Sequence, residues 1–78
     1  MAEIKYEIRR RLGVLSTNER SGWTKEANLV SWNGGPEKLD IRDWKPDHSK
    51  MSKGITLSAD ETRALNMALN DLFRQEET

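Results

Sequence analysis

A capped amphipathic segment near the carboxyl-terminal end constrains the fold more than any other feature of this chain. Ser58 and Glu61 have the spacing of a capping box, in which each side chain accepts a hydrogen bond from the other residue's backbone amide. The apolar residues that follow recur at helical spacing and form one stripe: Leu65, Ala68, Leu69, Leu72 and Phe73. We therefore expect a helix over residues 59–75, with an apolar face that packs in the core or against a second subunit.

The residues before this helix predict four strands. Ile4, Tyr6 and Ile8 alternate with charged residues, which is typical of a strand with one buried face. Clusters of glycine, proline, asparagine and other turn residues then interrupt the extended pattern. The expected strands cover residues 4–16, 23–32, 38–44 and 54–57. Gly13 lies inside the first of them and predicts a bulge or bend, hence a strongly curved sheet.

One helix laid across one antiparallel sheet gives a two-layer α+β fold with the element order β-β-β-β-α. The 78 residues form a single domain, and a domain of this size has a marginal core. The chain has no cysteine and only one histidine, His48, so we expect neither a disulfide nor a zinc site to stabilise it. We therefore expect the chain to be stabilised as a homodimer, and we expect no metal and no cofactor.

The charges are segregated although the formal net charge is zero. Residues 1–57 contain eleven Lys or Arg against eight Asp or Glu, whereas residues 58–78 contain two against five. A basic sheet region favours a nucleic-acid partner, and an acidic helix disfavours binding to anionic membranes. No signal-peptide or membrane-spanning pattern is visible, so we expect a soluble, cytoplasmic protein.

The third expected strand carries the residues most typical of ligand binding. Along residues 38–44 the period of two places Lys38, Arg42 and Trp44 on one face and apolar residues on the other. Two cations and an indole on one face favour binding of unpaired nucleic acid, whose bases stack on aromatic rings while cations contact phosphates. No spacing around the loop residue His48 indicates a catalytic triad, so no enzymatic activity is expected.

Several motifs resemble one known family. LDIRDW at residues 39–44, a polar loop and KGITLS at residues 53–58 resemble the positive cofactor four superfamily of transcriptional coactivators. GW at residues 22–23 and VSWN at residues 30–33, with a long basic first strand, resemble its small bacterial YdbC-like branch. The resemblance covers nearly the whole chain. It implies a β-β-β-β-α subunit that dimerises through its helix region and binds single-stranded DNA in channels of curved sheets.

The resemblance also implies DNA-contacting residues on the second and third strands and in the following loop: Trp32, Lys38, Arg42, Trp44 and Lys53. Four further candidates rest on the strand pattern alone: Arg9, Arg11, Trp23 and Lys25. The NGGPE turn, which contains no basic residue, stands where the eukaryotic coactivators have a basic hairpin, and this reduces the density of cations there. No serine-rich extension precedes the first strand, so we expect no regulation through such a tail.

Each candidate also has a purely structural interpretation. Large aromatic residues often belong to the core, and for Trp23 we consider core or interface packing as frequent as ligand contact. The arginines of the first strand also suit an exposed sheet edge, where charge prevents unwanted pairing. Asp40 shares the face of Arg42 and partly compensates its charge. His48 is expected to be exposed and uninvolved.

Three functions are consistent with this pattern. The first is homodimeric binding of single-stranded DNA with little sequence specificity, in transcription, replication or repair, and compatible with association with a bacterial nucleoid. The second is a protein-interaction module for a transcription or repair factor, with the tryptophans as an apolar patch. The third is binding of single-stranded RNA, because stacking and phosphate contacts neither require nor exclude a 2′-hydroxyl. A small-molecule substrate is not expected.

Overall fold

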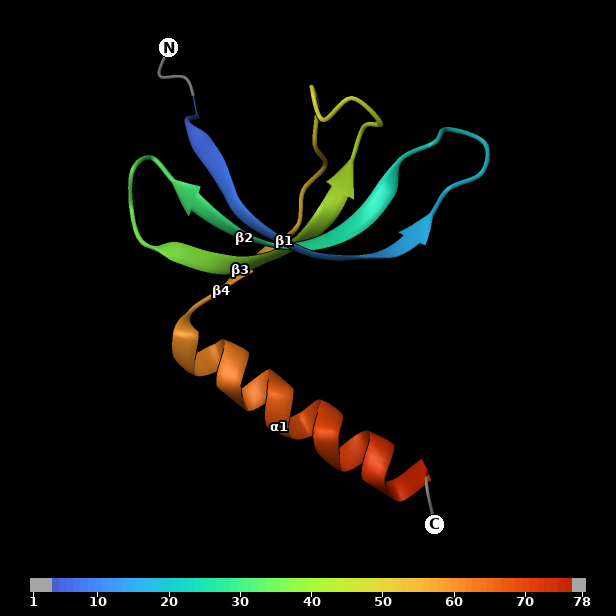
Figure 1. Ribbon diagram of the computed structural model, residues 1–78, viewed down its shortest axis with the longest axis vertical. Helices are drawn as coiled ribbons and strands as arrows, with labels where there is room; N and C mark the ends of the chain where they lie inside the picture. Colours follow the sequence, from blue (N-terminus) through green and yellow to red (C-terminus); the bar gives the residue numbers. More distant parts are fainter. Residues whose placement is uncertain (1–3, 77–78) are drawn as a thin grey trace.

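Four strands form one antiparallel sheet in the order β1-β2-β3-β4, and helix α1 follows the last strand (Figure 1). The structure, a computed structural model, describes residues 4–76. The elements are β1 Tyr6–Thr17, β2 Thr24–Trp32, β3 Glu37–Trp44, β4 Ile55–Leu57 and α1 Ala59–Glu76. The expected α+β order is confirmed, and each element begins and ends within two residues of its expected range.

Strand β1 bends because its pairing with β2 slips at three places. The shifts lie between Ile8 and Arg10, between Arg11 and Gly13, and between Val14 and Ser16. At each shift two residues of β1 advance past one residue of β2, which is the pattern of a β-bulge, and bulges bend and twist a strand. The irregularity predicted at Gly13 is confirmed, and the sheet curves strongly, with a concave and a convex face (Figure 1).

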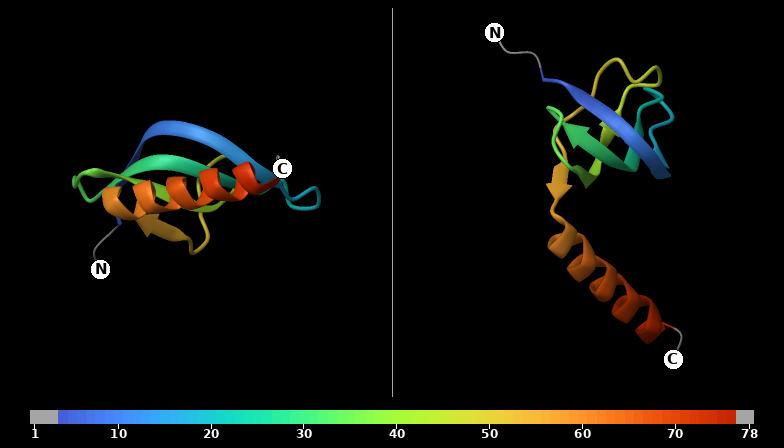
Figure 2. Two further views of the ribbon diagram at one scale, coloured as in Figure 1. Left: turned by 90° about the horizontal axis from the view of Figure 1, so that it is seen from below. Right: turned by 60° about the vertical axis from the view of Figure 1, so that its left-hand side comes forward.

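The strand register assigns residues to these two faces. In β2 and β3 the even-numbered residues share the concave face and the odd-numbered residues share the convex face. The connection of residues 45–54 between β3 and β4 folds over the concave face, where His48 is hydrogen-bonded to Tyr6 and Glu26. Helix α1 lies on the convex side (Figures 1 and 2).

The interior of the single chain is small and rich in polar groups. Val30 and Trp44 are completely buried, and so are the polar side chains of Asn28 and Asp40, at 1% and 0% exposure. Glu26 is also buried. All five belong to the concave face, whereas the buried residues Ser31 and Leu39 belong to the convex face. Most of the buried side chains therefore lie on the side that the 45–54 connection covers.

Helix α1 begins at the predicted capping box. The Ser58 amide donates to Glu61 Oε1 at 2.8 Å, and the Glu61 amide donates to Ser58 Oγ at 3.1 Å. These hydrogen bonds from the Ser58 backbone and side chain lower the pKa of the Glu61 carboxyl. The capping box is therefore confirmed.

The apolar stripe of α1 packs against its own sheet only near the start of the helix. Leu65 is half-buried, but Leu69, Leu72 and Phe73 are 41%, 48% and 56% exposed. The helix extends away from the sheet (Figure 2). Assignment of these three residues to the core of the same chain is therefore wrong, and their role as a dimer contact stays a prediction.

Gly54 allows β4 to approach β3 closely. A Cβ atom at this position would collide with the backbone of Ile41 and the side chain of Arg42. Any other residue would therefore push β4 away from the sheet. The glycine of the KGITLS motif thus has a packing role.

Among residues 4–76, no helix is long and apolar enough to cross a membrane. Within these same residues, no group of three or more His, Cys, Asp or Glu side chains could hold a metal ion.

Replacement of the helix cap tests its contribution to stability. Ser58→Ala removes the hydroxyl that accepts the Glu61 amide, and we expect it to lower the free energy of unfolding by about 1 kcal/mol. Urea denaturation at fixed protein concentration measures this change. Asn70→Ala, on an exposed part of the same helix, is the control and should not destabilise the protein. Equal stability of the Ser58→Ala variant and the parent chain would contradict the assignment.

Candidate nucleic-acid interface

Three of the predicted site residues lie together on the concave face. Trp32, Lys38 and Arg42 line an open cavity of about 420 Å³. The rest of its wall comes from the amino-terminal segment, the β2–β3 turn and β4: Ile4, Asn33, Gly35, Pro36 and Thr56. Asn33 and Gly34 adopt positive φ angles of 51° and 74° and turn the chain sharply between Trp32 and Lys38. The sheet and its turn thus bring an indole, a guanidinium and an ammonium group to one site.

Arg42 is held in place by a buried carboxylate. Its Nε and Nη2 atoms donate to the two oxygens of Asp40, each at 2.6 Å, and Asp40 is fully buried. Thr56 Oγ1 donates to the same carboxylate at 2.9 Å. The fixed guanidinium lies 4.7 Å from the centre of the Trp32 ring, a cation–π distance. Arg42 and Trp32 therefore form a pre-organised stack of two flat groups.

The excess positive charge of this cavity comes from Lys38. The charge of Arg42 is compensated by Asp40, as the sequence predicted. Lys38 is exposed and forms no hydrogen bond within the described residues. Its ammonium group is therefore available to an anionic ligand. Arg42 contributes mainly its flat surface, because its Nη1 group already donates to the Ser52 carbonyl at 3.4 Å and to Met51 Sδ at 3.5 Å.

Trp44 does not present an open face, and the prediction that it lies exposed on the ligand side is wrong for this conformation. It shares the concave face with Arg42, but its exposure is 0%. The rings of Tyr6 and His48 lie 5.5 Å and 5.4 Å from it. The 45–54 connection folds back over the ring and covers it, which strand periodicity alone does not reveal.

Tyr6 and His48 are site residues that the sequence did not indicate. Tyr6 contacts both Trp32 and Trp44, with ring centres 5.8 Å and 5.5 Å apart, and so joins them in one aromatic cluster. The indole N–H groups of Trp32 and Trp44 are buried and have no hydrogen-bond partner among the described residues. Each unpaired buried donor destabilises the folded chain by about 1–3 kcal/mol. A conformation or ligand that accepts a hydrogen bond from such a donor is therefore favoured.

His48 ties the connection to the sheet, so the expectation that it is exposed and uninvolved is wrong. Its Nε2 atom lies 3.0 Å and 3.2 Å from the carboxylate oxygens of Glu26, and its carbonyl accepts a hydrogen bond from the Tyr6 hydroxyl at 3.4 Å. Burial raises the pKa of Glu26, but hydrogen bonds from Thr24, His48 and Asn28 outweigh this effect and hold that pKa below its ordinary value of 4.5. Glu26 is thus an ionised anchor for the connection.

The other basic candidates lie around this cluster without forming one patch. Arg11 is opposite Asn28 and therefore belongs to the concave side, whereas Arg9 is the extra residue of the first bulge, so alternation no longer fixes its direction. Arg9 pairs instead with exposed Glu7 at 3.3 Å. Only in an uninterrupted strand would alternation place Arg9 and Arg11 on the same face. Lys53 is exposed and directly precedes Gly54, which places it at the Arg42 side of the sheet.

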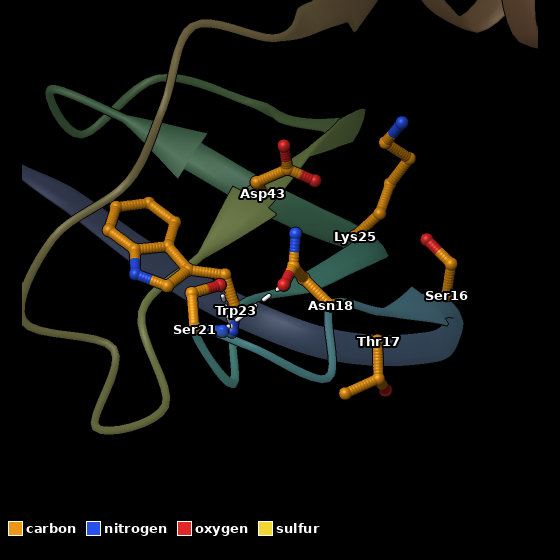
Figure 3. A pocket seen from close by; sticks show the side chains of 7 residues that line it. All are labelled: Ser16, Thr17, Asn18, Ser21, Trp23, Lys25 and Asp43. Atoms are coloured by element: carbon orange, nitrogen blue, oxygen red, sulfur yellow. Dashed lines mark hydrogen bonds between the residues drawn. The ribbon is translucent and has the colours of Figure 1, made fainter.

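Trp23 and Lys25 belong to a different site. They line a second cavity of about 560 Å³ at the β1–β2 hairpin, together with Ser16, Thr17, Asn18, Ser21 and Asp43 (Figure 3). Lys25 and Asp43 are odd-numbered residues of the convex face. The predicted site residues are therefore divided between the two sides of the sheet.

The comparison with protein families agrees with this arrangement of strands and helix. Residues 19–68, which include β2, β3, β4 and the first part of α1, match the family described as Transcriptional Coactivator p15 (PC4). The chain belongs to this family. The predicted membership of the positive cofactor four superfamily is thus confirmed, and at a coarse level it supports a nucleic-acid-binding or coactivator role.

A bacterial protein is also similar to this chain. It comes from Treponema pallidum (strain Nichols), is described as an uncharacterized protein, and is 50% identical over 70 residues. The match covers 90% of this chain and 81% of the relative. A relative of this kind is consistent with a bacterial branch of the positive cofactor four family, as the YdbC-like motifs suggested.

The acid dependence of stability tests the role of Glu26. Because its pKa is lower in the folded state than in the unfolded state, its contribution is complete above the ordinary carboxyl range and is lost as the pH falls through the lowered value. We expect Glu26→Gln to destabilise the protein near neutral pH, and the difference from the parent chain to shrink on acidification. Urea denaturation at several pH values measures both effects.

Glu37→Gln provides the control, because Glu37 is an exposed carboxylate at the start of β3. It should show little difference from the parent chain at any pH. Suppose that Glu26→Gln does not lower the free energy of unfolding at neutral pH, or lowers it equally at every pH. Either result would show that the carboxylate does not anchor the connection.

Proposed function

We propose that this member of the positive cofactor four family binds single-stranded DNA as a homodimer, with little sequence preference. The observation that carries the proposal is the Trp32–Arg42 stack in an open cavity beside the exposed ammonium group of Lys38. We assign it no catalytic step, and we propose a cytoplasmic role in transcription, replication or repair.

Stacking supplies most of the proposed base contact. Unpaired bases stack on aromatic rings and on guanidinium planes, and every base has a flat face, so this contact does not select a sequence. The Trp32–Arg42 pair offers both kinds of surface in a fixed arrangement. Since Asp40 already holds Arg42, the protein loses little side-chain freedom when a base stacks there.

Cations around the concave face supply the phosphate contacts. Lys38, Lys53 and Arg11 are exposed and come from β3, the 45–54 connection and β1. Phosphate contacts release counterions from the nucleic acid, so the affinity should fall as the salt concentration rises. The formal net charge of zero does not oppose this interaction, because basic residues exceed acidic ones in residues 1–57 and the compensating acidic excess lies in residues 58–78.

The covered indole of Trp44 suggests a role for the 45–54 connection. For a base to stack on Trp44, this connection must swing away and break the His48–Glu26 contact. Opening also exposes the unpaired N–H group of Trp44 to a hydrogen-bond acceptor. We propose that the strand extends from the Trp32 cavity onto Trp44 in this open form.

A second copy of the chain is the proposed partner of the apolar surfaces. Leu69, Leu72 and Phe73 of α1 and Ile55 of β4 are largely exposed in the single chain. The polar interior of the sheet buries few apolar side chains, and a domain of this size commonly obtains stability from oligomerisation. Two copies that cover these surfaces with one another would place two concave faces in one molecule.

Two other functions use parts of the same surface. A protein-interaction module would use the exposed stripe of α1 for another protein instead of a second copy. Single-stranded RNA could occupy the Trp32 cavity, since stacking and phosphate contacts do not depend on the 2′-hydroxyl. Competition between matched DNA and RNA strands decides between the two nucleic acids.

Substitutions in the cavity test the DNA-binding proposal. We expect Trp32→Ala to weaken binding of a labelled oligothymidylate by roughly 5- to 150-fold, the equivalent of the about 1–3 kcal/mol that stacking contributes per base. Lys38→Gln should weaken binding and reduce the slope of log affinity against log salt by about one. Fluorescence anisotropy of the oligonucleotide measures both, and Arg42 is left intact because its loss would strand the buried Asp40.

Arg74→Gln in the last turn of α1 removes one cation far along the helix and serves as the matched control. Its affinity and salt slope should stay close to those of the parent chain. If all three variants bind alike, or if the parent chain shows no salt-dependent binding, the DNA-binding proposal is wrong.

A substitution that introduces a charge into the apolar stripe of α1 tests whether this stripe forms the dimer contact. We expect the parent chain to sediment as a dimer and Leu69→Glu to sediment as a monomer, because the carboxylate would be buried in the contact. Asn70→Glu adds the same charge beside the stripe and should still dimerise. A parent chain that sediments as a monomer at micromolar concentration, or a dimer that tolerates Leu69→Glu, would contradict the proposed contact.

A further inference from the structure

The cavity at the β1–β2 hairpin is a second polar site on the opposite side of the sheet from the Trp32 cavity. Its volume of about 560 Å³ lies within the range of ligand sites, about 300–1,000 Å³. One wall is the half-buried ring of Trp23, and the other lining groups are polar or charged (Figure 3). An aromatic wall facing polar groups suits a flat, polar ligand.

The two charged residues of this cavity are not paired with one another. Lys25 is directly opposite Asp43 in the β2–β3 register and opposite Ser16 in the β1–β2 register, so the three side chains share one face. Opposite charges at such positions commonly attract. Nevertheless, neither Lys25 nor the Asp43 side chain forms an ion pair or hydrogen bond within the described residues. A donor and an acceptor are therefore both available to a ligand.

The hairpin turn fixes the position of the third polar group. Asn18 Oδ1 accepts hydrogen bonds from the amides of Arg20 and Ser21 at 3.0 Å and 3.1 Å, which leaves its Nδ2 group as a free donor. The Asn18 amide donates to the carbonyl of Trp23 at 2.8 Å, and the Trp23 amide donates to Ser21 Oγ at 3.2 Å. The backbone of Trp23 and the side-chain amide of Asn18 are thus held by one hydrogen-bonded turn (Figure 3).

The chemistry of these groups selects among the bases. An ionised carboxylate only accepts hydrogen bonds, whereas an ammonium group and the Nδ2 of Asn18 only donate. Guanine is the base whose pairing edge carries two neighbouring N–H donors, N1–H and N2–H, next to an acceptor, O6. Adenine and cytosine each offer a single donor group there, and thymine offers one N–H between two acceptors. Asp43 therefore complements guanine better than any other base.

We propose that this cavity binds one guanine base of an unpaired strand. The base stacks on Trp23, its N1–H and N2–H groups donate to Asp43, and O6 accepts a hydrogen bond from Asn18, while Lys25 contacts the adjacent phosphate. The proposal rests on the proposed function and deepens it, because it adds one base-selective site on the convex face to a protein whose concave face stacks bases without preference.

The site is compatible with the proposed homodimer. On the convex face the apolar residues Leu29, Leu39 and Leu57 are in register at the end of the sheet nearest to α1. Lys25 and Asp43 lie together at the other end of the sheet, beside the β1–β2 hairpin. A second copy that covers the apolar end therefore leaves the polar end available.

Titration with mononucleotides tests the guanine site independently of strand binding in the Trp32 cavity. dGMP, dAMP, dCMP and dTMP are added in turn, and the indole N–H of Trp23 and the amides of Lys25 and Asp43 are followed by NMR. We expect dGMP to bind about tenfold more tightly than the others, as a good bidentate base contact provides. Asp43→Asn, which replaces one acceptor by a donor, should abolish this preference, and Asp47→Asn in the exposed 45–54 connection should retain it. Equal binding of all four nucleotides, or no change at these three residues, would overturn the proposal.

Oligonucleotides separate this inference from the DNA-binding proposal. An oligothymidylate with one guanine at its centre should bind about tenfold more tightly than plain oligothymidylate, and Asp43→Asn should remove the advantage. Salt-dependent binding of both strands with equal affinity overturns the guanine site and leaves the proposed function standing. Preferential binding of dGMP together with no binding of oligothymidylate would support the guanine site and overturn the proposed DNA-binding function.

Discussion

The buried carboxylate of Asp40 determines the arrangement of the candidate interface. A fully buried charge is costly unless it is paired and hydrogen-bonded, and here Arg42 and Thr56 satisfy it. This requirement fixes the Arg42 guanidinium over the ring of Trp32 and joins β4 to β3 across the concave face. The buried core therefore sets the position of the Arg42 guanidinium, and in the proposed function this fixed flat surface receives a base.

The two sides of the sheet differ in composition, and the difference separates their roles. The concave side buries acids, an amide and aromatic rings under the 45–54 connection, whereas the convex side and α1 carry aliphatic residues. A chain that places its polar groups inside and leaves Leu72 and Phe73 exposed has an incomplete apolar core. A second copy completes this core in the proposed homodimer. The bulges of β1 bend the sheet, and the part of the concave side next to Trp32 remains an open cavity.

The fold was predictable because its signals are local. The spacing of Ser58 and Glu61 defines the start of the helix, and the turn residues define the ends of the strands. The site was predictable only in part. The period of two placed Arg42 and Trp44 on one face correctly, but the cover over Trp44 depends on the contact of His48 with Glu26, which is 22 residues distant. No local pattern encodes such a contact, and three bulges in β1 likewise invalidated simple alternation for the arginines of that strand.

In the proposed function, unpaired nucleic acid binds to the concave face through the Trp32–Arg42 stack. The most direct measurement is a ¹H–¹⁵N NMR titration of the labelled protein with an oligothymidylate. We expect the indole N–H signal of Trp32 and the amide signals of Lys38 and Arg42 to shift most, followed by the signals of Trp44 as the 45–54 connection opens. Shifts that are confined to α1, or unchanged signals from Trp32 and Trp44 at saturating oligonucleotide, would contradict it.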